Sequence, residues 1–143
     1  MVKPDYPHPA SPAVTKVMRG NKRRDTKPEV RIRSLLHRSG LRFRKDHRVR
    51  PAEGRPVRVD IAFTARRLAV FIDGCFWHSC PEHGKRPKRN TAYWHPKLTR
   101  NMERDAENTA ALTRAGWTVL RIWEHVAPED AAEQVRAALE ALL

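Results

Sequence analysis

The chain has 143 residues, of which 40% are hydrophobic and 31% charged, so it has room for one domain of ordinary size. Its longest purely apolar run, Leu68 to Ile72, is far shorter than the roughly 20 residues that span a bilayer, and its first residues lack the apolar stretch of a secretory signal. Two cysteines are too few for a disulfide scaffold and suit a reducing cytoplasm. Composition therefore predicts a soluble cytoplasmic protein.

Positive charge is concentrated in the first part of the chain. The formal net charge is +13; residues 1–60 hold 17 basic and 6 acidic residues, whereas residues 61–143 hold 12 and 10. This asymmetry favours a surface that meets nucleic acid, although a merely solubilising surface would carry the same charge.

Residues 1–24 are predicted to form a flexible basic arm ahead of a single domain at residues 25–143. Four prolines and few large apolar residues lie in the first fifteen positions. The basic segment that follows, residues 14–24, suits a path along DNA, with Met18 as an apolar wedge for the minor groove. A frayed basic helix start explains the same segment equally well.

The domain is expected to begin with a helix from Thr26, which fits a capping box with Glu29, to about Ser39, with Gly40 as its stop. Its predicted apolar face holds Ile32, Leu35 and Leu36.

Strands are expected next. Residues 41–44 suit a short edge strand, and the alternation of Val57, Val59, Ile61 and Phe63 predicts a strand with Asp60 on its opposite face. Residues 68–72 read as a central strand buried on both faces, joined to the previous one by a hairpin.

The second half predicts a helix, a strand and a helix. After an irregular excursion at residues 74–90, a helix is expected from about Pro96 to Ala115, then a core strand at residues 118–123 and an amphipathic helix from Pro128. The inward face of the first helix is predicted to hold Leu98, Met102, Ala106, Thr109 and Leu112. The chain is thus expected to be a mixed α/β domain with a small central sheet.

A metal site is predicted in the excursion. Cys75, Cys80 and His83 fall within nine residues, and thiolate and imidazole are preferred ligands of Zn²⁺. His125, just after the last strand, is the best fourth ligand, and His78 is a competitor. A closed four-ligand site has no open position for water, so we expect a structural zinc.

Asp60 and His78 are the catalytic candidates. A carboxylate within an apolar strand costs desolvation energy unless it is paired or metal-bound, so the alternative is a salt bridge to Arg58 or Arg66. If adjoining strands bring Asp60 and His78 together, they could hold Mg²⁺ and activate water against a phosphodiester. The capping box alone explains Glu29.

Aromatic residues accompany the metal loop. Phe76 and Trp77 are attached to it, and Tyr93 and Trp94 follow a basic run. Large aromatics in a polar, basic segment suit stacking on bases or insertion between base steps. For Trp94, packing at the start of a helix is the alternative.

Several blocks together resemble the very-short-patch repair (Vsr) DNA mismatch endonucleases, from about Val14 to His125. The blocks are Arg24-Asp-Thr-Lys-Pro-Glu29, Val59-Asp60, Phe71-Ile-Asp-Gly-Cys-Phe-Trp-His78, Tyr93-Trp94, Asn101-x-Glu-Arg-Asp105 and Gly116-Trp-x-Val-x-x-Ile-Trp-Glu-His125. The Gly-Cys-Phe-Trp-His block beside a Cys/His loop is the most specific of them.

The resemblance implies a restriction-endonuclease-like fold and an enzyme of the bacterial cytoplasm, associated with the nucleoid, that nicks one strand of duplex DNA 5′ of the thymine in a T·G mismatch. It makes other mismatch-repair proteins plausible partners. Because a mismatch is asymmetric, we expect a monomer on DNA.

The resemblance also implies residue roles. Asp60 and the main-chain carbonyl of Ile72 would bind Mg²⁺, His78 would act as general acid/base, and Glu29 would hold a metal-bound water. The implied DNA wedge consists of Phe76, Trp77 and Trp94. The implied zinc ligands are Cys75, Cys80, His83 and His125.

The chain departs from the family pattern at three points. Asp73 stands where some relatives carry histidine, and it could approach the metal or lower the local basicity. The last zinc ligand is His125 where others use cysteine. The lysine of the wider restriction-like motif has no counterpart after Asp60, and the family uses His78 instead.

Two alternatives remain open. One is a related nicking endonuclease that responds to a DNA sequence or modification. The other is a non-catalytic, zinc-stabilised DNA-binding protein, against which Asp60 and His78 speak because binding alone needs no acid in a basic groove.

Overall fold

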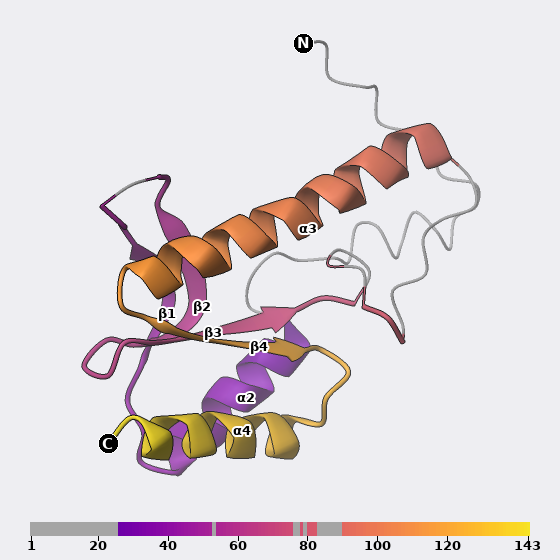
Figure 1. Cartoon of the computed structure of the whole chain (residues 1–143). Helices are drawn as coiled ribbons and strands as arrows, with labels where there is room; N and C mark the ends of the chain where they lie inside the picture. The colour runs from indigo at the N-terminus through magenta and orange to yellow at the C-terminus, as the bar shows by residue number, and fades with distance from the viewer. Residues whose placement is uncertain (1–25, 53, 76–77, 79, 83–89) are drawn as a thin grey trace.

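The computed structural model describes residues 26–52, 54–75, 78, 80–82 and 90–143 (Figure 1). The predicted arm at residues 1–24 lies outside this set, and so do Met18, Phe76, Trp77 and His83. Its elements are α2 (Lys27–Arg38), β1 (Arg44–Val49), β2 (Val57–Phe63), β3 (Leu68–Asp73), α3 (Thr91–Arg114), β4 (Thr118–Trp123) and α4 (Pro128–Ala141). None of the helices among these residues is long and apolar enough to cross a membrane.

The four strands form one sheet in the order β1-β2-β3-β4. The pairs β1–β2 and β2–β3 are antiparallel, whereas β3 and β4 are parallel, with Val70 opposite Leu120. The parallel pair requires a crossover, and α3 supplies it. As predicted, β3 is a central strand, and four of its first five residues are buried.

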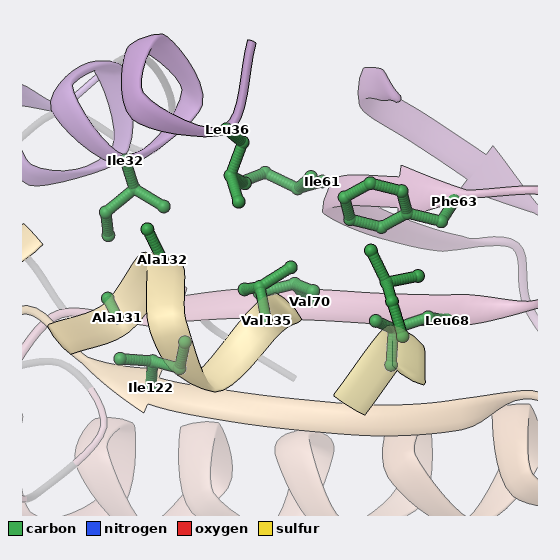
Figure 2. Packing of buried hydrophobic residues seen from close by; sticks show 11 residues of the cluster. Ile32, Leu36, Ile61, Phe63, Leu68, Val70, Ile122, Ala131, Ala132 and Val135 are labelled. Carbon is green, nitrogen blue, oxygen red and sulfur yellow. The ribbon is translucent and has the colours of Figure 1, made fainter. Parts of the chain in front are cut away.

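Helices cover both faces of the sheet, with α2 and α4 on one face and α3 on the other (Figure 1). The larger core lies between the sheet and the α2–α4 pair, where Ile32 and Leu36 of α2 meet Val135 of α4 (Figure 2). A smaller core, which includes Leu112 of α3, covers the other face. The mixed α/β architecture predicted from the sequence is confirmed.

Strand β2 departs from its predicted alternation. Val57 and Val59 pack in the smaller core, whereas Ile61 and Phe63 pack in the larger one, so the prediction that all four share a face is wrong. The change occurs at Asp60. Pairing of β2 with β3 covers only residues 61–63 of β2. Before them, the Asp60 carboxylate accepts a backbone N–H of β3 in place of a hydrogen bond between the two strands.

Two other boundaries and one helix cap differ from prediction. The edge strand begins at Arg44 and not at Leu41, since Leu41 and Phe43 pack against the larger core. Helix α2 begins where predicted, but Thr26 makes no side-chain capping hydrogen bond, so the capping box is wrong. Helix α3 begins at Thr91, and Pro96 lies inside it.

The predicted inward face of α3 is correct only in part. Leu98 and Leu112 are buried, but Met102 is 45% exposed and Ala106 is also exposed. Figure 1 shows the N-terminal end of α3 extending past the ends of the strands, where the sheet cannot cover it.

Candidate active site and metal centre

Three acidic side chains are buried where α2, β2 and β3 meet. They are the only buried polar or charged residues in the described part of the chain: Glu29, Asp60 and Asp73, which are 3%, 7% and 5% exposed. Buried like charges repel each other in a low dielectric, which costs folding free energy. Such a group is therefore a candidate for function.

Asp60 lies where the β2–β3 pairing stops. Its Oδ2 accepts the backbone N–H of Ile72 at 2.8 Å, and its Oδ1 lies 3.4 Å from Arg58 Nη2. Burial is the main cause that raises the pKa of Asp60, and the charges of Glu29 and Asp73 add to it, while the Ile72 N–H and Arg58 oppose it; the resulting pKa is about 6. The salt bridge to Arg58 expected as the alternative is therefore present, although it does not restore an ordinary pKa.

Each of the three carboxylates faces its own arginine. The pairs are Glu29 with Arg33 at 2.7 Å, Asp60 with Arg58 at 3.4 Å and Asp73 with Arg121 at 3.0 and 3.2 Å. Because Glu29 is buried, pairs with Arg33 and acts electrostatically on Asp60, its explanation as a capping residue alone is wrong.

The raised pKa of Asp60 predicts how the stability of the protein changes with pH. Between its ordinary value of 3.8 and about 6, the folded chain binds a proton that the unfolded chain releases. This contribution to the free energy of unfolding is complete at low pH and is lost as pH rises through that window. Asp60→Asn stays neutral at every pH. At pH 7 its free energy of unfolding, measured by urea denaturation, is expected to exceed that of the natural chain by roughly 2–3 kcal/mol.

The free energy of unfolding is measured without Mg²⁺ for both chains. The difference between the two chains is then compared at pH 4 and at pH 7. The change in that difference reports the titration of Asp60 together with its electrostatic coupling to Glu29 and Asp73. A difference that stays constant over this pH range would contradict the prediction.

His78 is held beside two of the acidic side chains. Its backbone N–H donates to the Gly74 carbonyl at 3.1 Å, and its Nδ1 contacts an Asp105 carboxylate oxygen and lies 3.9 Å from Asp73. Burial lowers the pKa of His78, but the hydrogen bond to Asp105 and the charges of both carboxylates outweigh it, so the pKa is raised. With Nδ1 engaged, Nε2 is the ring atom suited to proton exchange.

Arg121 connects the partners of His78. Its guanidinium binds Asp73, donates to the Asp105 main-chain carbonyl at 3.2 Å and to Thr109 Oγ1 at 2.9 Å, and stacks on Phe71 with 4.2 Å to the ring centroid. Asp73 therefore forms an ion pair with Arg121. Burial nevertheless raises the pKa of Asp73 above its usual range. Neither Asp105 nor Arg121 is predicted from the sequence, because each meets His78 or Asp73 across a long chain separation.

A second cluster begins two residues after Asp73. The Sγ atoms of Cys75 and Cys80 lie 3.3 and 3.7 Å from His125 Nδ1, and the ligand atoms of all three residues lie within 4.8 Å of one another. His125 Nε2 faces Glu82 at 3.5 Å, the arrangement that orients a metal-binding imidazole. The predicted approach of His125 to the cysteines is confirmed.

The donor set of this cluster fits zinc. Burial, together with hydrogen bonding and charge from the neighbouring Cys80, raises the pKa of Cys75 to about 11. Two thiolates so close are stabilised when a cation lies between them. Three of the four predicted ligands are therefore together, and His83 lies outside the described residues.

Trp94 is packed, being 6% exposed. Its ring lies edge-on against Tyr93, with centroids 5.0 Å apart, and Lys97 Nζ is 5.9 Å from its centroid. The packing alternative describes Trp94 in this DNA-free structure, since an intercalating ring must be exposed to reach a base step. The other predicted wedge residues lie outside the described set.

Comparison with known proteins agrees with the geometry. The sequence pattern of the family described as DNA mismatch endonuclease Vsr matches residues 11–83, about half of the chain. The chain is 52% identical over 130 residues to the Type II nicking enzyme V.NaeI of Lentzea aerocolonigenes, covering 91% of this chain and 78% of that protein.

Two more relatives support the same assignment. The Type II nicking enzyme V.XorIIP of Xanthomonas oryzae is 44% identical over 105 residues, which are 71% of each protein. The DNA mismatch endonuclease Vsr of Escherichia coli is 39% identical over 113 residues, covering 77% of this chain and 68% of that protein. Together with the buried acidic site and the Cys/His cluster, these matches show that the chain belongs to the DNA mismatch endonuclease Vsr family, whose members are DNA endonucleases of restriction-endonuclease-like fold.

Proposed function

We propose that this endonuclease nicks one strand of duplex DNA immediately 5′ of the thymine in a T·G mismatch, by Mg²⁺-dependent phosphodiester hydrolysis that starts very-short-patch repair. The observation that carries the proposal is the buried Asp60, which ends the β2–β3 pairing and lies near Glu29 and Asp73. A relative is named a mismatch endonuclease, and two others are named nicking enzymes.

The acidic group fits a divalent cation. Mg²⁺ prefers carboxylate and carbonyl oxygens, and a bound cation would relieve the repulsion that helps to raise the pKa of Asp60. Asp60 and the main-chain carbonyl of Ile72 would hold it, because the two residues already meet through the Ile72 N–H. When bound, Mg²⁺ would polarise the phosphate and lower the pKa of a coordinated water.

The remaining residues have roles that follow from their contacts. His78, fixed through Nδ1 by Asp105, would exchange a proton at Nε2 with the attacking water or the leaving oxygen. Glu29, held by Arg33, would orient a water near Asp60. Cys75, Cys80 and His125, with His83, would bind a structural Zn²⁺ that shapes the loop carrying His78.

Recognition would rely on deformation of the DNA. A T·G wobble pair is weakly stacked, so inserting aromatic rings beside it costs less than beside a matched pair. Unstacking costs about a few kcal/mol per step, and stacking on a ring returns about 1–3 kcal/mol per base. Phe76, Trp77 and Trp94 would supply the rings, with Met18 as an additional wedge; Trp94 would first have to leave its packed position.

A nicking assay tests the proposal. Matched and T·G duplexes of the same sequence are incubated with the protein and Mg²⁺, and the strands are separated on a denaturing gel. We expect one nick, 5′ of the mismatched thymine, in the T·G duplex alone. Equal nicking of both duplexes would contradict mismatch specificity and favour the sequence- or modification-dependent alternative.

Two further outcomes complete the test. DNA binding without any nick, across a panel of mismatches and flanking sequences, would contradict the enzyme and favour a zinc-stabilised DNA-binding protein. The complex is expected to contain one protein chain per mismatch, since the lesion has no two-fold symmetry.

We place this activity in the bacterial cytoplasm at the nucleoid, where other mismatch-repair proteins would be partners.

A further inference from the structure

The three arginines that face the buried carboxylates are not equivalent. Arg33 and Arg121 have side chains only 12% and 23% exposed and lie within 3.2 Å of their partners. Arg58 is 35% exposed, and its contact with Asp60 is the longest of the three, at 3.4 Å. It is therefore the guanidinium that can most readily exchange its carboxylate for another anion.

Arg58 has a second acidic partner on the neighbouring strand. Its Nη1 donates to Asp46 Oδ1 at 2.8 Å, shorter than its contact with Asp60. The β1–β2 register places Asp46 across from Asp60, because Lys45 pairs with Ile61 and His47 with Val59. The guanidinium thus lies between one carboxylate of the edge strand and the predicted metal ligand.

The backbone at Asp46 is unusual for a strand. Its φ is 49°, in the left-handed region, which non-glycine residues rarely adopt and which costs about 1–2 kcal/mol. Aspartate tolerates this region better than most residues. The neighbouring residues pair normally with β2, so the conformation aims one side chain without breaking the strand pair.

Resting on the proposed function, we infer that Arg58 is a phosphate-binding residue of the active site. Asp46 and Asp60 hold its guanidinium in the DNA-free protein, and it binds a DNA phosphate beside the scissile bond when a divalent cation takes Asp60. The planar fork of arginine matches two phosphate oxygens as well as it matches a carboxylate.

The inference predicts opposite effects of Arg58→Gln in two experiments. In the DNA-free, zinc-loaded protein, loss of the guanidinium removes the competitor at Asp60, so Mg²⁺ alone, titrated by calorimetry, should bind about 3- to 10-fold more tightly. With DNA, one phosphate contact is lost. The slope of log binding constant against log salt should decrease by about one, and nicking should fall roughly 10- to 100-fold.

Arg48→Gln is the matched control. Arg48 is exposed and lies directly opposite Arg58 in the strand register. Its substitution by glutamine removes one positive charge, as Arg58→Gln does. It should leave the Mg²⁺ affinity of the DNA-free protein unchanged. Arg58→Lys should preserve this affinity too, because the charge remains, while recovering only part of the nicking, because the fork is lost.

The results separate this inference from the proposed function. An unchanged salt slope in Arg58→Gln would overturn phosphate binding, whether or not Mg²⁺ affinity changes. Equal Mg²⁺ affinity in Arg58→Gln and the natural chain would overturn the competition at Asp60. Neither measurement requires cleavage, so both remain decisive if T·G duplexes are not nicked. Failure of the proposed function would appear separately, as absent nicking by the natural chain.

Discussion

Asp60→Ala is expected to reduce nicking of a T·G duplex by about three orders of magnitude or more while leaving DNA affinity largely intact. The lost carboxylate is the predicted Mg²⁺ ligand, and metal stabilisation of a phosphoryl transition state is worth several kcal/mol, at about 1.4 kcal/mol for each tenfold in rate. DNA affinity depends mainly on basic residues and phosphate contacts, and all of the basic residues remain in this variant. Single-turnover nicking and equilibrium binding on the same duplex measure the two effects.

The control removes a different carboxylate by the same substitution. Asp130 lies exposed in the first turn of α4, on the opposite side of the sheet from α3. Asp130→Ala should retain nicking near that of the natural chain. Normal turnover by Asp60→Ala, at any Mg²⁺ concentration, would eliminate Asp60 as the metal-binding carboxylate.

The second large effect concerns the Cys/His cluster. We expect one tightly bound zinc per chain and its loss from Cys80→Ser, with a decrease in melting temperature of about 10 °C, equivalent to roughly 3 kcal/mol for a domain of this size. The cluster joins the chain after β3 to the chain after β4, so its loss frees both ends. Metal analysis of the purified protein and thermal unfolding measure the outcome.

His125→Ala and His37→Ala form a matched pair for this prediction. His125 contacts both sulfurs, whereas His37 is exposed in the last turn of α2. Only His125→Ala should weaken zinc retention against a chelator. If Cys80→Ser and His125→Ala both keep zinc as firmly as the natural chain does, the cluster is not the zinc site.

Local patterns in the sequence predict most elements of this fold. The helical spacing of Ile32 and Leu36 and the apolar run of β3 each depend on neighbours within a few positions, and both predictions are confirmed. Boundaries fail where packing overrides local preference. Met102 has the correct helical spacing to face inward, yet it is 45% exposed.

The candidate site is predictable to a lesser degree. Cys75, Cys80 and His125 are recognisable from residue type, and the structure brings them together. The contact of His78 with Asp105 spans 27 residues, and neither residue indicates the other. Likewise, nothing local to Asp60 shows that strand pairing stops there and that a backbone N–H turns to its carboxylate.

The position of β1 at the margin of the sheet has a consequence for solubility. The outer side of an edge strand can pair with a strand of another chain, and natural proteins discourage this pairing with charged residues such as lysine and arginine. Arg44, Lys45 and Arg48 place exposed cations on this margin. The same side chains therefore serve two purposes, attraction to polyanions and mutual repulsion between copies, and neutralising them would invite aggregation along β1.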